Sequence, residues 1–254
     1  MNQKLILFCT TLAALILIVG CKGDTGPAGS SGPFITGSVS GFVSLVQTDG
    51  TLPANQSGAM VGIQGTSLST TTDSIGKWTI NGLTTGTYTV NYSKSGYGSS
   101  ELADFQFTGG DTDFVAKVTL AQPPNFTVAI NPTETIADSN SLYVWYTTNV
   151  PQKVGYTRVL IAVGTTPNVN ASNPNDYLYS ATFVSTGTSI SEHIYQSDLE
   201  YAGFTSGMTV YVVAYPLCYG DAANEYSSYV DHTTGRTVYT SLGTPSNVIS
   251  LIVP

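Results

Sequence analysis

Short runs of β-forming residues, separated by turn residues, fill the chain from residue 38 to its C-terminus. Apolar residues alternate with polar ones within most runs, and Gly, Pro, Asn and Asp gather between them. No stretch of this part has the apolar period of an amphipathic helix. The pattern therefore predicts an all-β protein. The expected strands are 38–46, 59–65, 68–72, 76–82, 86–93, 103–107 and 112–120 in a first group, and 126–130, 141–148, 155–163, 177–184, 188–194, 208–216 and 247–253 in a second.

The two groups of predicted strands lie on either side of Pro123-Pro124. Seven short strands are enough for one small sandwich with its own hydrophobic core. Consecutive prolines restrict the backbone and indicate a short, stiff link. We expect two tandem Ig-like, Greek-key β-sandwiches, one at residues 37–121 and the other at residues 122–254.

The first 20 residues have the features of an export signal. Lys4 precedes an apolar run over residues 5–19, which is shorter than the about 20 residues that a membrane-spanning helix needs. The run ends in Ile18-Val19-Gly20-Cys21, which resembles the lipobox of bacterial lipoproteins. The resemblance implies that residues 1–20 are removed and that the Cys21 thiol carries a lipid that anchors the mature chain in the membrane. An uncleaved membrane anchor and an ordinary secretory signal are the alternatives.

Residues 21–36 predict an extended tether between the anchor and the first sandwich. Triplets begin at Gly23, Gly26, Gly29 and Gly32, so the segment resembles a collagen repeat. A triple helix needs glycine at every third position over many triplets, and four triplets are too few to form a trimer. We expect a polar spacer that lifts the sandwiches roughly 30–40 Å from the membrane, at about 3.1 Å per residue.

The charge balance limits the partners of the chain. Only 9% of residues are charged, and 16 acidic residues outnumber 8 basic ones. Removal of residues 1–20 deletes Lys4 alone, so the mature chain is one unit more negative than the −8 of the full chain. This balance argues against nucleic acid and against electrostatic adhesion to anionic lipid. With the lipobox, the acidic, Ser/Thr-rich composition favours the cell envelope, and within it the outer membrane, at its surface or its periplasmic face.

Cysteine usage leaves no intramolecular disulfide in the mature chain. Cys9 leaves with the signal peptide and Cys21 carries lipid, so Cys218 is the one remaining thiol of the sequence. We expect Cys218 to be buried and inert in the second sandwich.

Residues 61–97 carry a specific pattern of glycines, aromatics and branched residues. Its positions are Val61, Ile63, Gly65, Thr66, Thr72, Asp73, Gly76, Trp78, Gly82, Leu83, Gly86, Tyr88, Val90, Gly96 and Tyr97. They resemble the carboxypeptidase regulatory-like family, a transthyretin-like sandwich grouped with carbohydrate-binding-like folds. The resemblance implies an accessory or binding module without peptidase chemistry. We expect a hairpin turn at Asp73–Gly76, and Trp78, Ile80 and Leu83 inside the sandwich.

The second group of strands is similar to a fibronectin type III domain. The similarity is carried by Trp145 on the second strand, by the segment from Leu199 through Gly207 and Tyr211 to Ala214, and by Pro245-Ser-Asn247-Val before the last strand. It implies that Trp145 lies in the core and that Tyr211 forms a tyrosine corner.

Residues 217–246 are a long insertion where that family has a short loop. Within it, SSYVD and RTVYT flank HTTG, which predicts a protruding hairpin. Four tyrosines of the insertion are candidate ligand-binding residues: Tyr219, Tyr226, Tyr229 and Tyr239. Exposed tyrosines supply rigid, amphipathic contact area, but the same rings could instead cover the open edge of the sandwich. The other long connection, at 164–176, is polar and is expected to be solvated.

No catalytic or metal-binding constellation stands out. His193 falls in a predicted strand and His232 in a predicted turn, and Asp111 and Asp113 fit a solvated turn better than a calcium site. We expect no enzyme activity, metal or cofactor. The sequence predicts a non-enzymatic, lipid-anchored envelope protein that presents its sandwiches for binding, adhesion or surface architecture. A carbohydrate-binding surface module and a structural subunit of an envelope complex are the alternatives, so the expected partners are a glycan or a surface protein.

Overall fold

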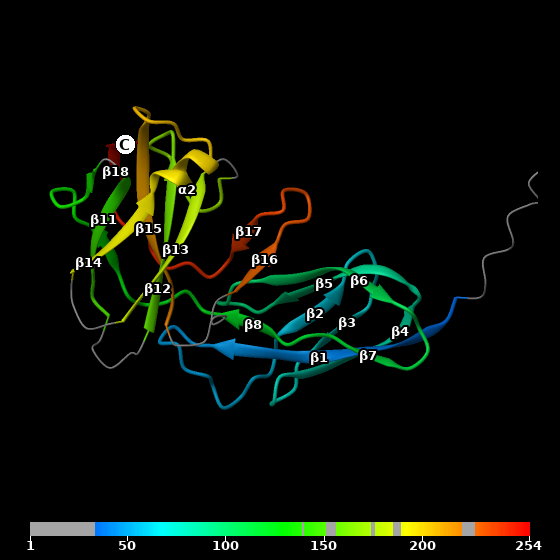
Figure 1. The fold of residues 1–254 in the computed structure, drawn as a ribbon. Coiled ribbons are helices and arrows are strands. Elements are labelled where there is room, and N and C mark those ends of the chain that lie inside the picture. Colours follow the sequence, from blue (N-terminus) through cyan, green and yellow to red (C-terminus); the bar gives the residue numbers. More distant parts are fainter. Residues whose placement is uncertain (1–33, 139, 151–155, 174–175, 185–188, 220–226) are drawn as a thin grey trace, which may run out of the picture. The chain divides into compact units, whose positions relative to one another are not determined.

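The structure is a computed structural model that describes residues 34–138, 140–150, 156–173, 176–184, 189–219 and 227–254. These residues form strands and their connections, with one short helix, α2 (Gln196–Tyr201) (Figure 1). The predicted all-β fold is confirmed. Cys21, the predicted signal peptide and nearly all of the tether lie outside the described residues. In the described part of the chain, no helix is long and apolar enough to cross a membrane.

The first sandwich consists of two four-stranded sheets. Its strands are β1 (Thr36–Val46), β2 (Met60–Ile63), β3 (Ser69–Thr71), β4 (Lys77–Thr84), β5 (Gly86–Ser93), β6 (Ser100–Phe107), β7 (Thr112–Phe114) and β8 (Val118–Ala121). In one sheet β1 pairs antiparallel with β4 and parallel with both β7 and β8. The other sheet has the order β3-β2-β5-β6, with antiparallel neighbours throughout.

The core of the first sandwich comes from alternation along its strands. In β4 the side chains of Trp78, Ile80 and Leu83 are buried, as predicted, while Lys77 and Thr79 are exposed. The Trp78 ring meets the ring of Tyr92 on β5 edge-on, with ring centroids 5.9 Å apart. Such an edge-to-face contact is a favoured geometry for two aromatic rings, so it stabilises the joint between the sheets.

The predicted turn at Asp73–Gly76 connects β3 to β4. The Asp73 carboxylate accepts hydrogen bonds from the main-chain N–H groups of Ile75 and Lys77, at 3.0 and 2.9 Å. Gly76 has a φ of +81°, and a Cβ atom at this position would collide with the Val43 carbonyl oxygen. The position therefore needs glycine both for its backbone conformation and for the close approach of β1.

The prediction of a single strand at 112–120 is wrong. The chain forms two strands there, β7 and β8, which pair with different halves of β1. Val115 and Val118 both pack against the core. Residues three positions apart point to opposite faces of a regular strand. The chain must therefore break its strand between Val115 and Val118 to bring both side chains inward.

The second sandwich also has two sheets. Its strands are β9 (Val128–Ile130), β10 (Ile136–Ala137), β11 (Ser141–Thr148), β12 (Tyr156–Gly164), β13 (Tyr177–Val184), β14 (Ser189–Tyr195), β15 (Thr209–Tyr219) and β18 (Ile249–Ile252). One sheet has the order β10-β11-β14, with β9 also paired to β11, and the other has the order β13-β12-β15-β18. The two-residue strand β10 and the helix α2 are absent from the sequence prediction.

The two central strands of the β13-β12-β15-β18 sheet, β12 and β15, are buried on both faces. Val159, Ile161 and Val163 of β12 face the main core of the sandwich, whereas Leu160 and Ala162 belong to a second apolar cluster on the opposite face. A continuous apolar run is typical of a strand that is covered on both sides. Cys218 is buried in the second cluster, as predicted.

The prediction that residues 164–176 are solvated holds for the exposed residues 165–168 and 172 and is wrong for Val169 and Asp176. Val169 of this connection is buried in the second apolar cluster, and the Asp176 carboxylate is buried with it. Asp176 accepts hydrogen bonds from the Asn170 main-chain N–H and from Asn173 Nδ2, at 2.8 and 3.0 Å. The segment is folded over the sheet because the outer face of β12 and β15 is apolar and must be kept from water.

The predicted hairpin around HTTG is confirmed, and it consists of β16 (Ser228–Val230) and β17 (Thr237–Tyr239). It does not protrude free of the sandwiches. Arg236 donates hydrogen bonds from its guanidinium to the carbonyl oxygens of Asn173 and Asp176, at 2.8 and 2.6 Å. Arg236 therefore fastens the hairpin to the segment that covers the second apolar cluster.

The base of the same hairpin is bonded to the first sandwich. Ser227 is fully buried, and its hydroxyl oxygen accepts the Ala121 main-chain N–H at 2.6 Å. Ser100 Oγ donates to the Ser228 carbonyl at 2.8 Å, and Thr240 Oγ1 donates to the Ser99 carbonyl at 2.5 Å. The insertion of the second sandwich is thus hydrogen-bonded to both sandwiches.

Candidate functional site

Four ring side chains line the outer face of the β10-β11-β14 sheet. Tyr143 and Trp145 come from β11, and His193 and Tyr195 come from β14. We call these four residues the aromatic strip. None of them belongs to a buried apolar cluster.

Strand alternation puts the strip on the outside of the sandwich. Leu142, Val144 and Tyr146 of β11 are fully buried, so the residues between them point away from the core. The expectation that Trp145 fills the core is therefore wrong. Tyr146 takes the core position that the similarity to fibronectin type III domains assigns to a tryptophan, and Trp145 lies on the opposite face.

The pairing of β11 with β14 brings the rings together. Tyr143 lies directly across the ladder from His193, Trp145 from Ser191, and Ser141 from Tyr195. The ring centroids of Tyr143 and His193 are 4.0 Å apart at an interplanar angle of 59°, and those of His193 and Tyr195 are 6.4 Å apart. The rings thus occupy three successive rungs of one sheet face.

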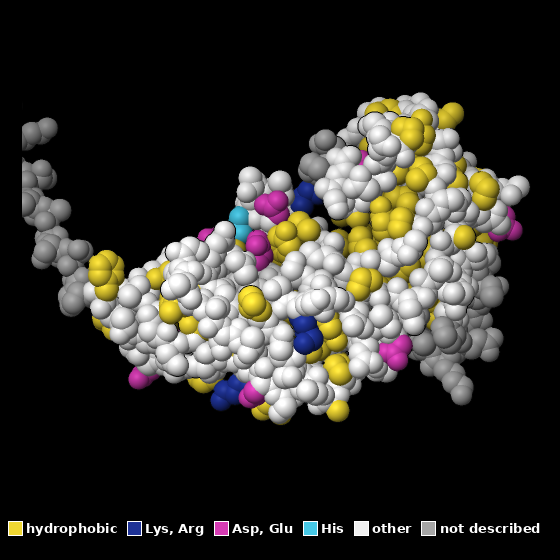
Figure 2. Space-filling model, turned by 180° about the vertical axis from the view of Figure 1, so that it is seen from behind, with side chains coloured by type: hydrophobic (Ala, Val, Ile, Leu, Met, Phe, Trp, Pro, Cys, Tyr) yellow, Lys and Arg dark blue, Asp and Glu magenta, His cyan; other side chains and the backbone are white. Residues whose placement is uncertain are grey.

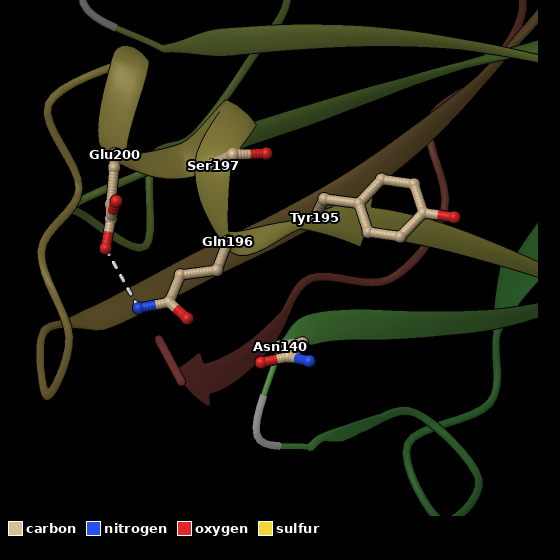
Figure 3. A pocket seen from close by; sticks show the side chains of 5 residues that line it. All are labelled: Asn140, Tyr195, Gln196, Ser197 and Glu200. Atoms are coloured by element: carbon tan, nitrogen blue, oxygen red, sulfur yellow. Dashed lines mark hydrogen bonds between the residues drawn. The ribbon is translucent and has the colours of Figure 1, made fainter.

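A polar pocket adjoins the strip at Tyr195. It has a volume of about 350 Å³ and is lined by Asn140, Tyr195, Gln196, Ser197 and Glu200. Gln196 Nε2 donates a hydrogen bond to Glu200 Oε1 at 2.9 Å. Figure 3 shows the Tyr195 ring and the Ser197 side chain pointing to one side, while Gln196 and Glu200 meet on the other.

Helix α2 holds the polar side of this pocket. The helix is only six residues long, and its Leu199 is fully buried in the main core. The Gln196 main-chain N–H donates to the Asn140 carbonyl at 2.8 Å, which ties the start of the helix to the beginning of β11. Gln196 and Glu200 are one helical turn apart and therefore lie side by side.

The electrostatic character of the strip and pocket is neutral to acidic. No Lys or Arg belongs to the strip or lines the described pocket. Glu200 is a charged residue that lines the pocket. Next to the strip, hydrogen bonds from the Asn140 and Ser141 main-chain N–H groups, with smaller contributions from the Tyr143 and Ser141 hydroxyls, lower the pKa of Asp138. Figure 2 shows one face of the molecule, on which charged side chains are few and scattered.

The inward face of β14 carries a separate carboxyl group. Glu192 alternates with His193 and points toward the core, opposite Val144. Burial raises its pKa, and its charge in turn contributes to the raised pKa of Tyr146 and of Tyr179. Glu192 is on the other side of the sheet from the strip, so it takes no part in the candidate site.

The strip and the pocket offer groups that can contact a ligand. Flat rings offer apolar faces, and amide, hydroxyl and carboxylate groups offer hydrogen-bond donors and acceptors. Among the residues that the structure describes, no group of three or more His, Cys, Asp and Glu could hold a metal ion. The His193 ring packs against the rings of Tyr143 and Tyr195.

The tyrosines singled out from the sequence do not lie in the aromatic strip. Tyr226 is outside the described residues, as is the side chain of Tyr219, which ends β15. Tyr239 is half-buried against the second apolar cluster, and Tyr229 is half-buried on β16. Tyr239 thus packs over the outer face of a sheet, rather than over the edge of the sandwich.

Arg236 lines two further cavities, each of about 240 Å³. Thr237 lines both, Asp231 lines one, and Tyr239 lines the other. Hydrogen bonds from the main-chain N–H groups of Thr233 and Thr234 lower the pKa of Asp231. Arg236 already donates to two carbonyl oxygens here, so the geometry accounts for it as a structural fastening.

The strip had a signal in the sequence. Tyr143 and Trp145 alternate with buried residues in the predicted strand 141–148, and His193 does so in the predicted strand 188–194. Tyr195 lies one residue beyond that prediction, because β14 continues to Tyr195. What was missing was the pairing of these two strands, which are far apart in the chain.

Comparisons with solved structures give matches of low TM-score. A type II cohesin–X-dockerin complex from Acetivibrio cellulolyticus is 31% identical over 33% of this chain and 56% of that chain, with a TM-score of 0.28, so the chain spans only about half of it. A protein from Bacteroides uniformis, proposed to bind carbohydrate, is 12% identical over 86% of this chain and 99% of that chain, with a TM-score of 0.31. A DUF3823 family protein from Parabacteroides merdae is 11% identical over 86% and 100%, with a TM-score of 0.30. Similarities of this size say nothing about function.

Comparison with curated proteins finds no match. The family model of the carboxypeptidase regulatory-like domain matches residues 38–121, which contain the pattern from Val61 to Tyr97. The match covers the first sandwich and none of the second. Residues 38–121 are therefore a carboxypeptidase regulatory-like domain.

Proposed function

We propose that this protein is a non-enzymatic, lipid-anchored protein of the cell envelope whose second sandwich binds glycans. The observation that carries the proposal is the aromatic strip, four rings on one outer sheet face, with a polar pocket at its end. Tyr195 is exposed, the other three rings are half-buried, and none of the four belongs to the core of either sandwich. A ligand with both apolar faces and many hydroxyl groups fits it best.

Sugars have this combination of surfaces. The C–H groups of a pyranose ring form an apolar face that stacks on an aromatic ring, and its hydroxyls both donate and accept hydrogen bonds. Asn140, Gln196 and Ser197 offer donors and acceptors in the pocket, and Glu200 offers acceptors. Tyr195 is 56% exposed and lines the pocket, so one ring serves both parts of the site.

The anchoring part of the proposal is supported by the sequence. The Ile18-Val19-Gly20-Cys21 segment and the Gly-X-Y tether would place the sandwiches at the end of a short spacer, on the outer membrane. Binding of a glycan from an envelope protein serves adhesion or capture of a polysaccharide. If the full chain binds no glycan, a structural role within an envelope complex replaces this function.

The binding proposal is tested with the full chain purified in detergent micelles. On a glycan array and by titration calorimetry, we expect saturable binding that Tyr195→Ala weakens at least tenfold, a loss of about 1.4 kcal/mol. Phe114→Ala is the matched control, because Phe114 is 74% exposed and lies on β7 of the first sandwich. Equal binding by the two variants would exclude the strip as the site.

The anchoring proposal has its own test. Mass spectrometry of the protein from native membranes should find an N-terminal peptide that begins at a lipid-modified Cys21. Cys21→Ser should release the protein from the membrane fraction. An unmodified N-terminus that still starts at Met1 would contradict lipid anchoring and leave the glycan site untouched.

A further inference from the structure

We infer that the ligand of this site is a neutral, extended glycan chain, which lies along the aromatic strip with one end in the polar pocket. This inference rests on the proposed function. It concerns which class of glycan the site takes, and three features of the site support it: the length of the strip, the position of the pocket, and the lack of Lys and Arg among the residues of the strip and the described pocket.

The strip is long enough for several sugar units. Its three rungs are Trp145 with Ser191, Tyr143 with His193, and Ser141 with Tyr195. Successive rungs on one face of a sheet are about 6.8 Å apart, so the first and third are separated by about 14 Å. A single sugar ring is similar in size to one aromatic side chain and would cover one rung. Only an oligosaccharide of several units can contact Trp145 and Tyr195 at the same time.

The pocket is the natural place for an end of this chain. Its volume of about 350 Å³ lies at the small end of the range for ligand pockets, about 300–1,000 Å³. It therefore suits about one sugar unit. Since Tyr195 belongs to both pocket and strip, a unit bound in the pocket continues directly onto the rings of His193 and Tyr143.

The charges of the site disfavour acidic sugars. Glu200 lines the pocket, and the Asp138 carboxylate, which the Tyr143 hydroxyl helps to stabilise, lies beside the strip. None of the described residues of the strip or pocket is a Lys or Arg that could pair with a sugar carboxylate. A uronic acid unit would thus bring a negative charge close to two carboxylates with no Lys or Arg of the described strip or pocket to offset it, which is unfavourable. A neutral unit instead donates its hydroxyl protons to Glu200.

The test compares two series of oligosaccharides on the full chain in detergent micelles. One series consists of neutral gluco-, xylo- and manno-oligosaccharides from disaccharide to hexasaccharide, and the other of oligogalacturonides of the same lengths. We expect the affinity for at least one neutral series to rise at least tenfold between disaccharide and hexasaccharide. We expect oligogalacturonides to bind at least tenfold more weakly than neutral chains of equal length.

Variants at the two ends of the strip sharpen the test. Trp145→Ala should remove the gain with length and leave disaccharide affinity within about twofold, whereas Tyr195→Ala should weaken every length. Glu200→Gln should raise the affinity for oligogalacturonides relative to neutral chains. Phe114→Ala should change neither series.

The outcomes separate this inference from the proposed function. If Tyr195→Ala abolishes binding but affinity is independent of chain length, or if oligogalacturonides bind as well as neutral chains, the inference is wrong and glycan binding stands. If no oligosaccharide of either series and no glycan of the array binds, both fail.

Discussion

A comparison of two glycines distinguishes the cost of a left-handed backbone from the cost of a steric collision. Gly65 and Gly76 have φ values of +78° and +81°. A Cβ atom at Gly65 would meet nothing within 4 Å, whereas at Gly76 it would meet the Val43 carbonyl oxygen and Gln56. Only Gly76 is therefore required for the approach of β1 as well as for the turn.

The pair gives a direct prediction for stability. Gly65→Ala should lower the free energy of unfolding by about 1–2 kcal/mol, the cost of a left-handed conformation for a residue with a Cβ atom. Gly76→Ala should cost clearly more, because β1 must also move. Urea denaturation of both variants measures the difference. Equal losses would mean that the collision at Val43 is relieved without cost.

Glu192 gives a prediction for pH dependence. Burial raises the pKa of Glu192 in the folded chain, so the folded state favours the protonated carboxyl. Its contribution to stability is fully present below the pKa of the unfolded chain and is lost as pH rises through the raised, folded value. Glu192→Gln should therefore stabilise the protein at neutral pH and have little effect in acid. Glu134→Gln, at an exposed position, is the control for thermal unfolding measured across this range. A gain that is the same at all pH values would contradict the role of ionisation.

Strands with clear alternation are where the sequence and the structure agree best. β5, β11 and β13 begin and end at the predicted residues. α2 was not predicted because its six residues are too few to display a helical period. The break between β7 and β8 depends on both Val115 and Val118 reaching the core, which is a property of the packed sandwich.

The candidate site shows the same limit. Alternation within β11 and within β14 is legible in the sequence, yet the strip exists only because these two strands are neighbours. The similarity to fibronectin type III domains assigned Trp145 to the core, so Trp145 was not predicted as a residue of the aromatic strip. The tyrosines of the insertion were predicted as ligand-binding residues because several occur close together in the sequence. In the structure, Tyr239 covers an apolar sheet face.

Arg236 provides a prediction about the hairpin as an element. Arg236→Met removes two charge-assisted hydrogen bonds to the carbonyls of Asn173 and Asp176, each worth about 1.5–3 kcal/mol in a shielded site. Hydrogen–deuterium exchange should accelerate in residues 165–173 and in β17, and remain unchanged in β2 and β5. Lys77→Met, at an exposed position of β4, is the control. Unchanged exchange in residues 165–173 would show that burial of Val169 and the hydrogen bonds to the Asp176 carboxylate hold this segment without Arg236.

On the scale of the whole molecule, the hairpin base couples the two sandwiches. Ser227 and Thr240 hydrogen-bond to Ala121 and Ser99 of the first sandwich, and Gly98 leaves room for both of them. A Cβ atom at Gly98 would lie 2.6 Å from the Ser227 Cβ and 2.7 Å from Thr240 Oγ1. The sandwiches are therefore packed against each other here without space for an added methyl group.

This coupling predicts cooperative unfolding. The wild-type chain should unfold in one calorimetric transition, whereas Ser227→Ala combined with Thr240→Val should separate it into two. The buried Ala121 N–H left without an acceptor costs about 1–3 kcal/mol at this joint. Ser99→Ala is the control, because Ser99 contributes its carbonyl rather than its exposed side chain. A single, shifted transition in the double variant would mean that other contacts couple the sandwiches.

The same hairpin constrains how such a protein can evolve. A domain that has its own hydrophobic core can in principle fold alone, and therefore be exchanged for another. In this protein, a recombination event that replaced residues 38–121 would leave Ser227 and Thr240 without their hydrogen-bond partners. The new domain would have to supply a glycine and two main-chain groups in the same places. The two halves are therefore expected to be inherited together, and a search for proteins of the same ancestry should begin from the joined pair.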